Sequence, residues 1–230
     1  MKKALIIAPQ FEPPNYLPPH DNNVSLWQAT LAARGFTSIV AASTPAETTL
    51  ASVRAVLRAF MQGLVKGDRW AIIRVSHGHR LIDQNGDELD GYDECFACSD
   101  LGLLVDDEMA TYLAIPPPGT VGDLVDDFCY SGTANQVAPL AAAVPRIGVG
   151  SGTRPAYYRY WQACQAYETS SWGYSDGQPY SIFSLYLCWA LRNYTFNPAI
   201  VVFNAAKNAT MSVASQTPIL SGPYQNAVPF

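Results

Sequence analysis

The chain has 230 residues, of which 49% are hydrophobic and only 14% are charged, well below the roughly 25% of an average soluble domain. This composition supplies a core of ordinary size and excludes a disordered tail or a coiled coil. The net charge of −5 argues against binding to nucleic acid phosphates, and no apolar run approaches the ~18 residues of a membrane span. We therefore expect a single domain over residues 1–230, with neither nucleic acid nor a membrane as its partner.

The first residues and the cysteines both bear on the cellular compartment. Two lysines precede a short apolar run at residues 4–8, but Pro9 and Gln10 end that run. A secretory signal needs an apolar stretch of about 7–15 residues. Five cysteines, an odd number, suit a reducing compartment better than a disulfide scaffold. These features predict a cytoplasmic protein.

Short apolar runs alternate with helical patterns along the chain. The predicted strands are residues 4–8, 38–42, 70–75 and 121–128, with 147–149 and 158–164 as further candidates. The predicted helices are residues 24–34, 46–64, 106–113, 181–192 and 199–213. Because parallel strands need crossover connections, this order predicts an α/β fold with a mostly parallel central sheet and helices on both faces.

A histidine and a cysteine follow two of the predicted strands. His77 follows the strand at 70–75, and Cys129 follows the strand at 121–128. Ligands bind beyond the carboxyl ends of parallel strands, so both residues lie where a site is expected. Only a thiolate attacks a carbonyl group, and an imidazole can remove the proton from the thiol. The backbone N–H groups of Gly78 and Cys129 complete the predicted site as an oxyanion hole.

The acidic residues are concentrated in the middle of the chain. Ten of the 19 lie between Asp83 and Glu108, and no Lys, Arg or His occurs between Arg80 and Arg146. Such a stretch is typical of a solvated acidic loop, but it also favours a surface that binds a metal ion or the basic side chain of a ligand.

The motifs around these residues resemble those of the metacaspases and their bacterial relatives, the caspase-like cysteine peptidases of clan CD. The matching segments include both candidate catalytic residues and the acidic stretch between them. In chain order they are Ser76-His77-Gly78, Gly86 to Glu94, Asp106-Asp107-Glu108 and Asp127-Phe128-Cys129-Tyr130-Ser131-Gly132. The resemblance implies a caspase-like fold and a cysteine endopeptidase that works with a Cys-His dyad.

Two further residues compete for the catalytic roles. In the family, an acid lies six residues after the catalytic histidine, and Asp83 lies six after His77, which favours His77 over His79. A caspase histidine lies about 50 residues before its cysteine. The separation favours Cys129 over Cys164, which we interpret as a small buried hydrophobic residue. Cys95-Phe96-Ala97-Cys98 lacks further zinc ligands at suitable spacing and is interpreted as structural.

The resemblance also implies a specificity, because metacaspases cleave after Arg or Lys with an acidic pocket. Asp127 matches one acid of that pocket. The other falls on Asn23, with Asp21 two residues away. The expected partner is thus a protein or peptide with a basic residue before the scissile bond. The same specificity makes Arg146, Arg154 and Arg159 candidate points of self-cleavage.

Metacaspases commonly need calcium, and the resemblance extends to that site. Asp93, Asp106 and Asp107 match three of the family's calcium ligands, and the fourth position falls on Gln136. Because fewer charged ligands weaken a calcium site, any calcium cofactor is expected to bind weakly.

Two departures from the family pattern favour an alternative function. Tyr130 replaces the histidine that follows the nucleophile, and Ser76 replaces the glycine before the catalytic histidine. These changes are compatible with a caspase-fold module that binds partners or serves as a scaffold without cleaving them. The presence of both His77 and Cys129 favours the peptidase.

Overall fold

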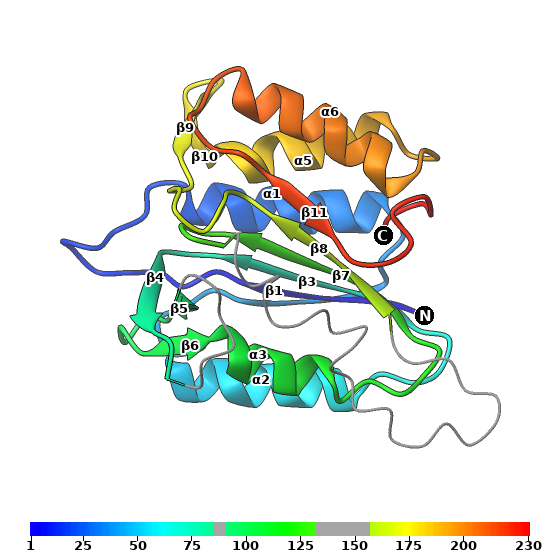
Figure 1. Cartoon of the computed structure of the whole chain (residues 1–230), viewed down its shortest axis with the longest axis horizontal. Coiled ribbons are helices and arrows are strands. Elements are labelled where there is room, and N and C mark those ends of the chain that lie inside the picture. The colour runs from blue at the N-terminus through cyan, green and yellow to red at the C-terminus, as the bar shows by residue number, and fades with distance from the viewer. Residues whose placement is uncertain (85–90, 132–156) are drawn as a thin grey trace.

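The computed structural model of the chain describes residues 1–84, 91–131 and 157–230. Its centre is a six-stranded sheet with the order β11-β8-β7-β3-β1-β2 (Figure 1). The strands are β1 (Lys2–Ile7), β2 (Ser38–Ala42), β3 (Arg69–Val75), β7 (Val121–Asp127), β8 (Tyr157–Gln162) and β11 (Ile219–Ser221). All neighbours pair in parallel except β11, which runs antiparallel to β8 at one edge.

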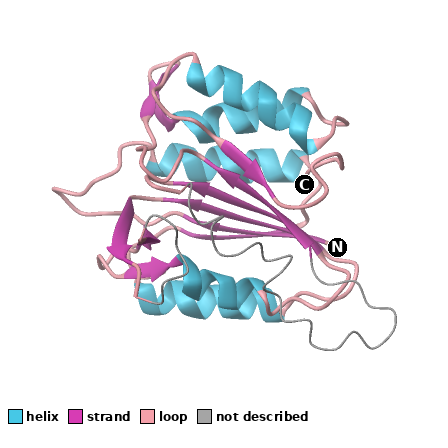
Figure 2. Ribbon diagram, viewed as in Figure 1, coloured by secondary structure: helices cyan, strands magenta, loops and turns pink. Residues whose placement is uncertain are grey.

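Helices cover both faces of this sheet (Figure 2). On one face lie α1 (His20–Ala33), α5 (Ile182–Asn193) and α6 (Ala199–Met211), and on the other lie α2 (Leu50–Gln62) and α3 (Asp106–Leu113). Strands buried on both faces read as continuous apolar runs, as residues 4–7 of β1 do. The predicted α/β architecture with a mostly parallel sheet and two helical layers is confirmed. Among the described residues, every helix falls short of the length or apolar character that a bilayer crossing requires.

The boundaries of the predicted elements hold to within a few residues, with the largest difference at α2. We predicted this helix over residues 46–64, but it begins at Leu50, because the Thr49 hydroxyl accepts a hydrogen bond from the backbone N–H of Ser52 and so caps the first turn. Val53, Leu57 and Met61 repeat every four residues and are fully buried. The strand candidate at residues 147–149 lies outside the described residues.

Two small sheets that we did not predict lie at the carboxyl ends of the parallel strands (Figure 1). The first contains β4 (Gly78–Ile82), β5 (Tyr92–Ala97) and β6 (Leu103–Val105), paired antiparallel. The second is a hairpin of β9 (Trp172–Ser175) and β10 (Gln178–Ser181). The β4–β6 sheet packs with α2 and α3, whereas β10 leads directly into α5. The two additions therefore flank the carboxyl edge of the main sheet from its two opposite faces.

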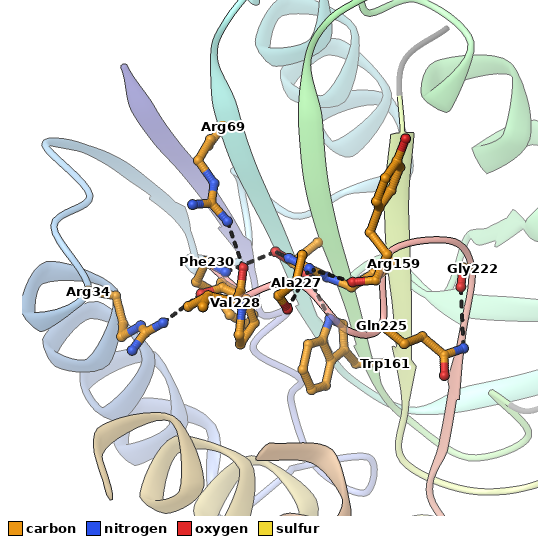
Figure 3. A network of polar contacts seen from close by, with 12 residues as sticks. Arg34, Arg69, Arg159, Trp161, Gly222, Gln225, Ala227, Val228 and Phe230 are labelled. Atoms are coloured by element: carbon orange, nitrogen blue, oxygen red, sulfur yellow. Dashed lines mark hydrogen bonds and ion pairs between the residues drawn. The ribbon is translucent and has the colours of Figure 1, made fainter. Parts of the chain in front are cut away.

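Arginine side chains bind the last residues of the chain over the amino edge of the sheet (Figure 3). Arg34 donates to the carbonyl of Pro229, Arg69 to that of Val228, and Arg159 to those of Tyr224 and Ala227. The ring of Phe230 is buried, with its centroid 5.8 Å from that of Trp161. These contacts leave the opposite, carboxyl edge to the candidate catalytic residues.

The position of Arg159 corrects one prediction. Its guanidinium donates two hydrogen bonds to the Asp123 carboxylate, at 2.6 and 2.8 Å, and its side chain is only 2% exposed. A peptidase cannot reach this bond without unfolding β8, so the folded chain does not offer Arg159 as a self-cleavage point. Arg146 and Arg154 lie outside the described residues, and their self-cleavage stays a prediction.

A second buried ion pair joins the two central strands. Arg74 on β3 donates to both carboxylate oxygens of Asp126 on β7, at 2.6 and 2.5 Å, and the Tyr160 hydroxyl donates to the same carboxylate. The guanidinium also lies over the rings of Phe96 and Phe128, at 5.5 and 5.3 Å. Burial lowers the pKa of Arg74, but the charge interactions and hydrogen bonds with Asp126 and Tyr160 together outweigh that effect, and the net shift is upward. The Arg74 guanidinium therefore stays charged inside the protein.

We predict that Arg74→Ala lowers the free energy of unfolding by about 3–5 kcal/mol, because it leaves the Asp126 carboxylate buried without its cation. The measurement is urea unfolding followed by circular dichroism. Arg54→Ala is the matched control, since it removes the exposed ion pair between Arg54 and Glu108 and should shift the midpoint far less. Equal shifts for the two variants would show that the buried pair is not a stability determinant.

Candidate active site

The pairing of β3 with β7 brings the predicted catalytic residues together. Val75 is the register partner of Asp127, and His77 and Cys129 each follow two residues later. The backbones are in contact, because a Cβ atom on Gly78 would lie 1.9 Å from the carbonyl oxygen of Cys129. The structure thus brings the backbones of the two predicted catalytic residues together at the carboxyl edge of the sheet, and their roles as nucleophile, base and oxyanion hole stay predictions.

The ring of His77 is oriented by the segment between β1 and α1. Its Nε2 atom lies 2.8 Å from the carbonyl oxygen of Asn15, which can only accept a hydrogen bond. Nε2 therefore holds the hydrogen, and in the neutral ring Nδ1 has the free electron pair that a general base needs. The Phe11 ring packs edge-on against the imidazole, with centroids 4.9 Å apart. Neither contact could be predicted from the sequence, because a backbone carbonyl has no sequence signature and Phe11 lies 66 residues before His77.

The thiol of Cys129 is partly buried and lies 3.9 Å from the carbonyl oxygen of Ser170. Burial raises its pKa, and the negative charge of Asp127 adds to the shift, while backbone hydrogen bonds at Ser170 and Gly78 lower it only in part. The resting side chain is therefore a thiol rather than a thiolate at neutral pH. A nucleophile in this state depends on a neighbouring base, which is the function that His77 can perform.

The other cysteines lie in environments that do not favour attack on a substrate. Cys164 is fully buried, within 3.4 Å of the carbonyl oxygens of Phe128 and Glu168, and burial raises its pKa to about 11. Burial likewise raises the pKa values of Cys95 and Cys98 to about 12. These environments agree with the interpretation of all three as structural residues. His79, the alternative histidine, lies exposed on β4, where its register partner is Cys95.

Asp127 lies at the end of β7, against the first turn of α5. Its carboxylate is 2% exposed and accepts hydrogen bonds from the hydroxyls of Ser170, Ser181 and Ser184 and from the backbone N–H of Ser184. The last bond caps the amino end of α5, where negative charge is favourable. Burial raises the pKa of Asp127, and the serine hydrogen bonds offset only part of that shift. The serines are functional candidates that the sequence did not reveal.

We refer to Asp127 and the three serines that donate to it, Ser170, Ser181 and Ser184, as the Asp127 cluster. Of the two other predicted pocket residues, only Asn23 contacts this cluster. Its amide oxygen accepts a hydrogen bond from the backbone N–H of Ser181, at 3.1 Å, and its side chain is fully buried. The Nδ2 atom of Asn23 has no hydrogen-bond partner among the described residues. Asp21, by contrast, has a side chain that is 87% exposed and pairs with Nδ1 of His20. The structure therefore places Asn23, and not Asp21, beside the predicted pocket.

The predicted calcium ligands lie on β5 and α3. Asp93 is on β5, while Asp106 and Asp107 begin α3. Burial, together with the charges of Asp107 and Asp93, raises the pKa of Asp106 to about 7. Within the described ranges, however, no three acidic, histidine or cysteine side chains are arranged so that they could hold a metal ion. Gln136 lies outside those ranges, so calcium binding stays a prediction, and we derive no catalytic step from it.

The contact between Gly78 and Cys129 generates a direct test. Gly78→Ala should remove most activity, because a Cβ atom 1.9 Å from the Cys129 carbonyl oxygen must push the two catalytic loops apart. Gly173→Ala on β9 is the control, since its Cβ atom would meet only ordinary contacts with Ile182 at 3.5 Å. Peptidase rates and melting temperatures of both variants are the measurements. Full activity in Gly78→Ala would contradict the close approach of the loops.

Comparisons with known proteins agree with this geometry. The caspase domain family model matches residues 1–224. Metacaspase-1 of Arabidopsis thaliana is 37% identical over 101 residues, which are 42% of this chain and 27% of that protein. Metacaspase-1B of Aspergillus clavatus is 42% identical over 87 residues, which are 34% of this chain and 21% of that protein.

The likeness in structure extends over the whole chain. A crystal structure of a Geobacter sulfurreducens protein aligns with a TM-score of 0.70, at 20% identity, over 99% of this chain and 97% of that one. This similarity concerns the fold alone. The matches to the two metacaspases each span about a quarter of their length, whereas the family model spans nearly all of this chain. The chain therefore belongs to the caspase domain family of cysteine peptidases, and metacaspases are among its relatives.

Proposed function

We propose that this protein is a cysteine endopeptidase of the metacaspase type, which hydrolyses peptide bonds after Arg or Lys. The observation that supports it best is the β3–β7 register, which aligns His77 with Cys129 while the Asn15 carbonyl leaves Nδ1 of His77 free to accept a proton. Membership of a peptidase family makes a protein or peptide the expected substrate.

The proposed reaction begins with proton transfer from the Cys129 thiol to Nδ1 of His77. The thiolate attacks the carbonyl carbon of the scissile bond, and the N–H groups of Gly78 and Cys129 stabilise the oxyanion that forms. When the C–N bond breaks, the imidazolium gives its proton to the leaving amine. Water, deprotonated by His77, then hydrolyses the thioester and releases the carboxylic acid and the thiol.

The Asp127 cluster supports the proposed preference for a basic residue before the scissile bond. Asp127 lies two residues before Cys129 and supplies a negative charge on the side of the site that faces α5. Because serine hydroxyls donate to both of its carboxylate oxygens, a substrate cation donates to the hydroxyl oxygens of Ser170 and Ser181, which can accept while they donate to Asp127. Asn23 stands where the family has a second acid, so the selectivity for basic residues depends on one carboxylate.

One observation favours the alternative, a caspase-fold module that binds without cleaving. Tyr130, directly after Cys129, has a φ of +62°, and the guanidinium of Arg80 lies 4.7 Å from the centre of its ring. The Arg80 side chain also lies 4.9 Å from the ring of Tyr92, so an ordered stack borders the nucleophile. A binding module would keep such a surface without any turnover, and the next experiment distinguishes the two functions.

We predict that Cys129→Ala and His77→Ala each lower the cleavage rate of an Arg-containing fluorogenic peptide by several orders of magnitude, because the dyad acts as a unit. Cys188→Ala, which removes a buried thiol of α5, is the matched control and should retain activity. Circular dichroism verifies that each variant is folded. If the wild-type protein cleaves no peptide, or if Cys129→Ala cleaves as fast as the wild type, the binding module is the better description.

The role of Asp127 predicts a pH dependence. We expect Asp127→Asn to lower kcat/KM for an Arg peptide at least ~100-fold and to affect a matched Gln peptide much less, because a partly buried cation needs its counter-charge. Since burial raises the pKa of Asp127, the wild-type ratio of Arg to Gln cleavage should fall on acidification above the range in which an ordinary aspartate protonates. Because titration of the dyad affects the cleavage of both peptides equally, it does not change this ratio. Faster cleavage after Asp than after Arg would contradict the assignment of this pocket.

A further inference from the structure

A cleft of about 480 Å³ lies beside His77, on the side of the site away from Asp127. We call it the His77 cleft. Its apolar walls are Phe11, Ala97, Leu101 and Leu103, and Asn15, His77 and His79 add polar groups to its lining. Its walls come from the β4–β6 sheet and from the segment that precedes α1, and none of the Asp127 cluster lines it. The β4–β6 sheet packs on the α2 and α3 face of the main sheet, whereas Asp127 contacts α5 on the other face.

The cleft is joined directly to the catalytic histidine. The backbone N–H of Ala97, at the end of β5, donates to the carbonyl of His77, and the Ser76 hydroxyl donates to the carbonyl of Ala97. Phe11, which forms another wall, packs edge-on against the imidazole ring. An occupant of this cleft therefore lies against the same ring that, in the proposed reaction, protonates the leaving amine.

Leu101 lines the cleft at a turn whose backbone conformation does not require a leucine. Its φ is +60°, a region that a bulky residue rarely adopts, and its side chain is 60% exposed. The turn is fixed by Asp100, whose carboxylate accepts from the backbone N–H groups of Leu50 and Gly102. Glycine would satisfy this turn without strain, and the exposed leucine gains little from burial. Strained, exposed residues of this kind are typical of ligand-binding positions.

We propose that the His77 cleft binds an apolar side chain, such as leucine or phenylalanine, of the substrate residue that directly follows the scissile bond. This inference rests on the proposed peptidase function. The leaving amine must pass His77 to receive its proton, so the residue attached to that amine lies on the His77 side of the site. The residue before the scissile bond lies on the Asp127 side. Among the described residues, the lining has four apolar side chains and no acidic or basic side chain other than the histidines, which favours an apolar occupant.

The test uses quenched fluorescent peptides that contain one Arg and differ only in the residue after it. We expect kcat/KM to be at least about tenfold higher for leucine than for aspartate at that position in the wild type, the usual scale of discrimination by an apolar pocket. Leu101→Gly should reduce this ratio several-fold while leaving the melting temperature unchanged or higher, because glycine adopts a positive φ freely. The ratio is independent of the fraction of folded enzyme.

Two controls separate this proposal from the proposed function. Ile82→Ser removes an exposed aliphatic side chain of β4 that does not line the cleft, and it should leave the leucine-to-aspartate ratio unchanged. An Arg-coumarin amide has no residue after the scissile bond, so its cleavage by the wild type tests the peptidase function alone. Cleavage of the amide with equal rates for leucine and aspartate peptides, or an unchanged ratio in Leu101→Gly, would overturn the cleft assignment.

Discussion

The pairing register of β3 with β7 is the constraint on which the active site depends. Arg74 and Asp126 are direct register partners, and their side chains form a bidentate ion pair on the same face of the sheet. A slip of one residue would turn every side chain of one strand to the opposite face and would bury each charge without the other. The same slip would separate His77 from Cys129. The buried pair thus stabilises the one alignment in which a thiol and an imidazole meet.

The alternation of side chains along β7 divides the chemistry between the two faces of the sheet. Asp126 points toward the layer of α2 and α3, where Arg74 neutralises it, whereas Asp127 points toward α5, where serine hydroxyls and a helix terminus stabilise it without a cation. Because no cation among the described residues donates a hydrogen bond to the Asp127 carboxylate, its negative charge can attract the basic side chain of a substrate. This difference suits the first of the two adjacent aspartates to stability and the second to the substrate recognition that we propose.

The candidate nucleophile is a thiol in the resting protein. Burial keeps Cys129 as a thiol, and the Asn15 carbonyl holds the imidazole in the tautomer that can accept its proton. In the proposed reaction, the attacking thiolate then forms by proton transfer from Cys129 to His77. Substrate on the Asp127 side and a leaving group on the His77 side would approach the two residues from opposite faces of the same sheet edge. Specificity before and after the scissile bond would therefore depend on separate sets of residues.

The sequence by itself determined the order and type of the main elements, because strands and helices follow from local apolar periodicity, as the Val53, Leu57 and Met61 stripe of α2 shows. It also placed His77 and Cys129 at strand ends and indicated the family through motifs around them. The β9–β10 hairpin had a local signal as well, because Asp-Gly is a dipeptide typical of two-residue hairpin turns, and Asp176 and Gly177 both adopt positive φ there.

Only the tertiary structure decided which distant groups surround each side chain. Ser170, Ser181 and Ser184 lie more than forty residues beyond Asp127, and nothing in their local pattern distinguishes them from surface serines. The Asn15 carbonyl that orients His77 is a backbone atom that every residue possesses. Arg159 has the sequence context of an accessible arginine, yet β8 buries it against Asp123. Such contacts depend on strand register and on the packing of layers, which arise from complementarity across the whole chain rather than from local preferences.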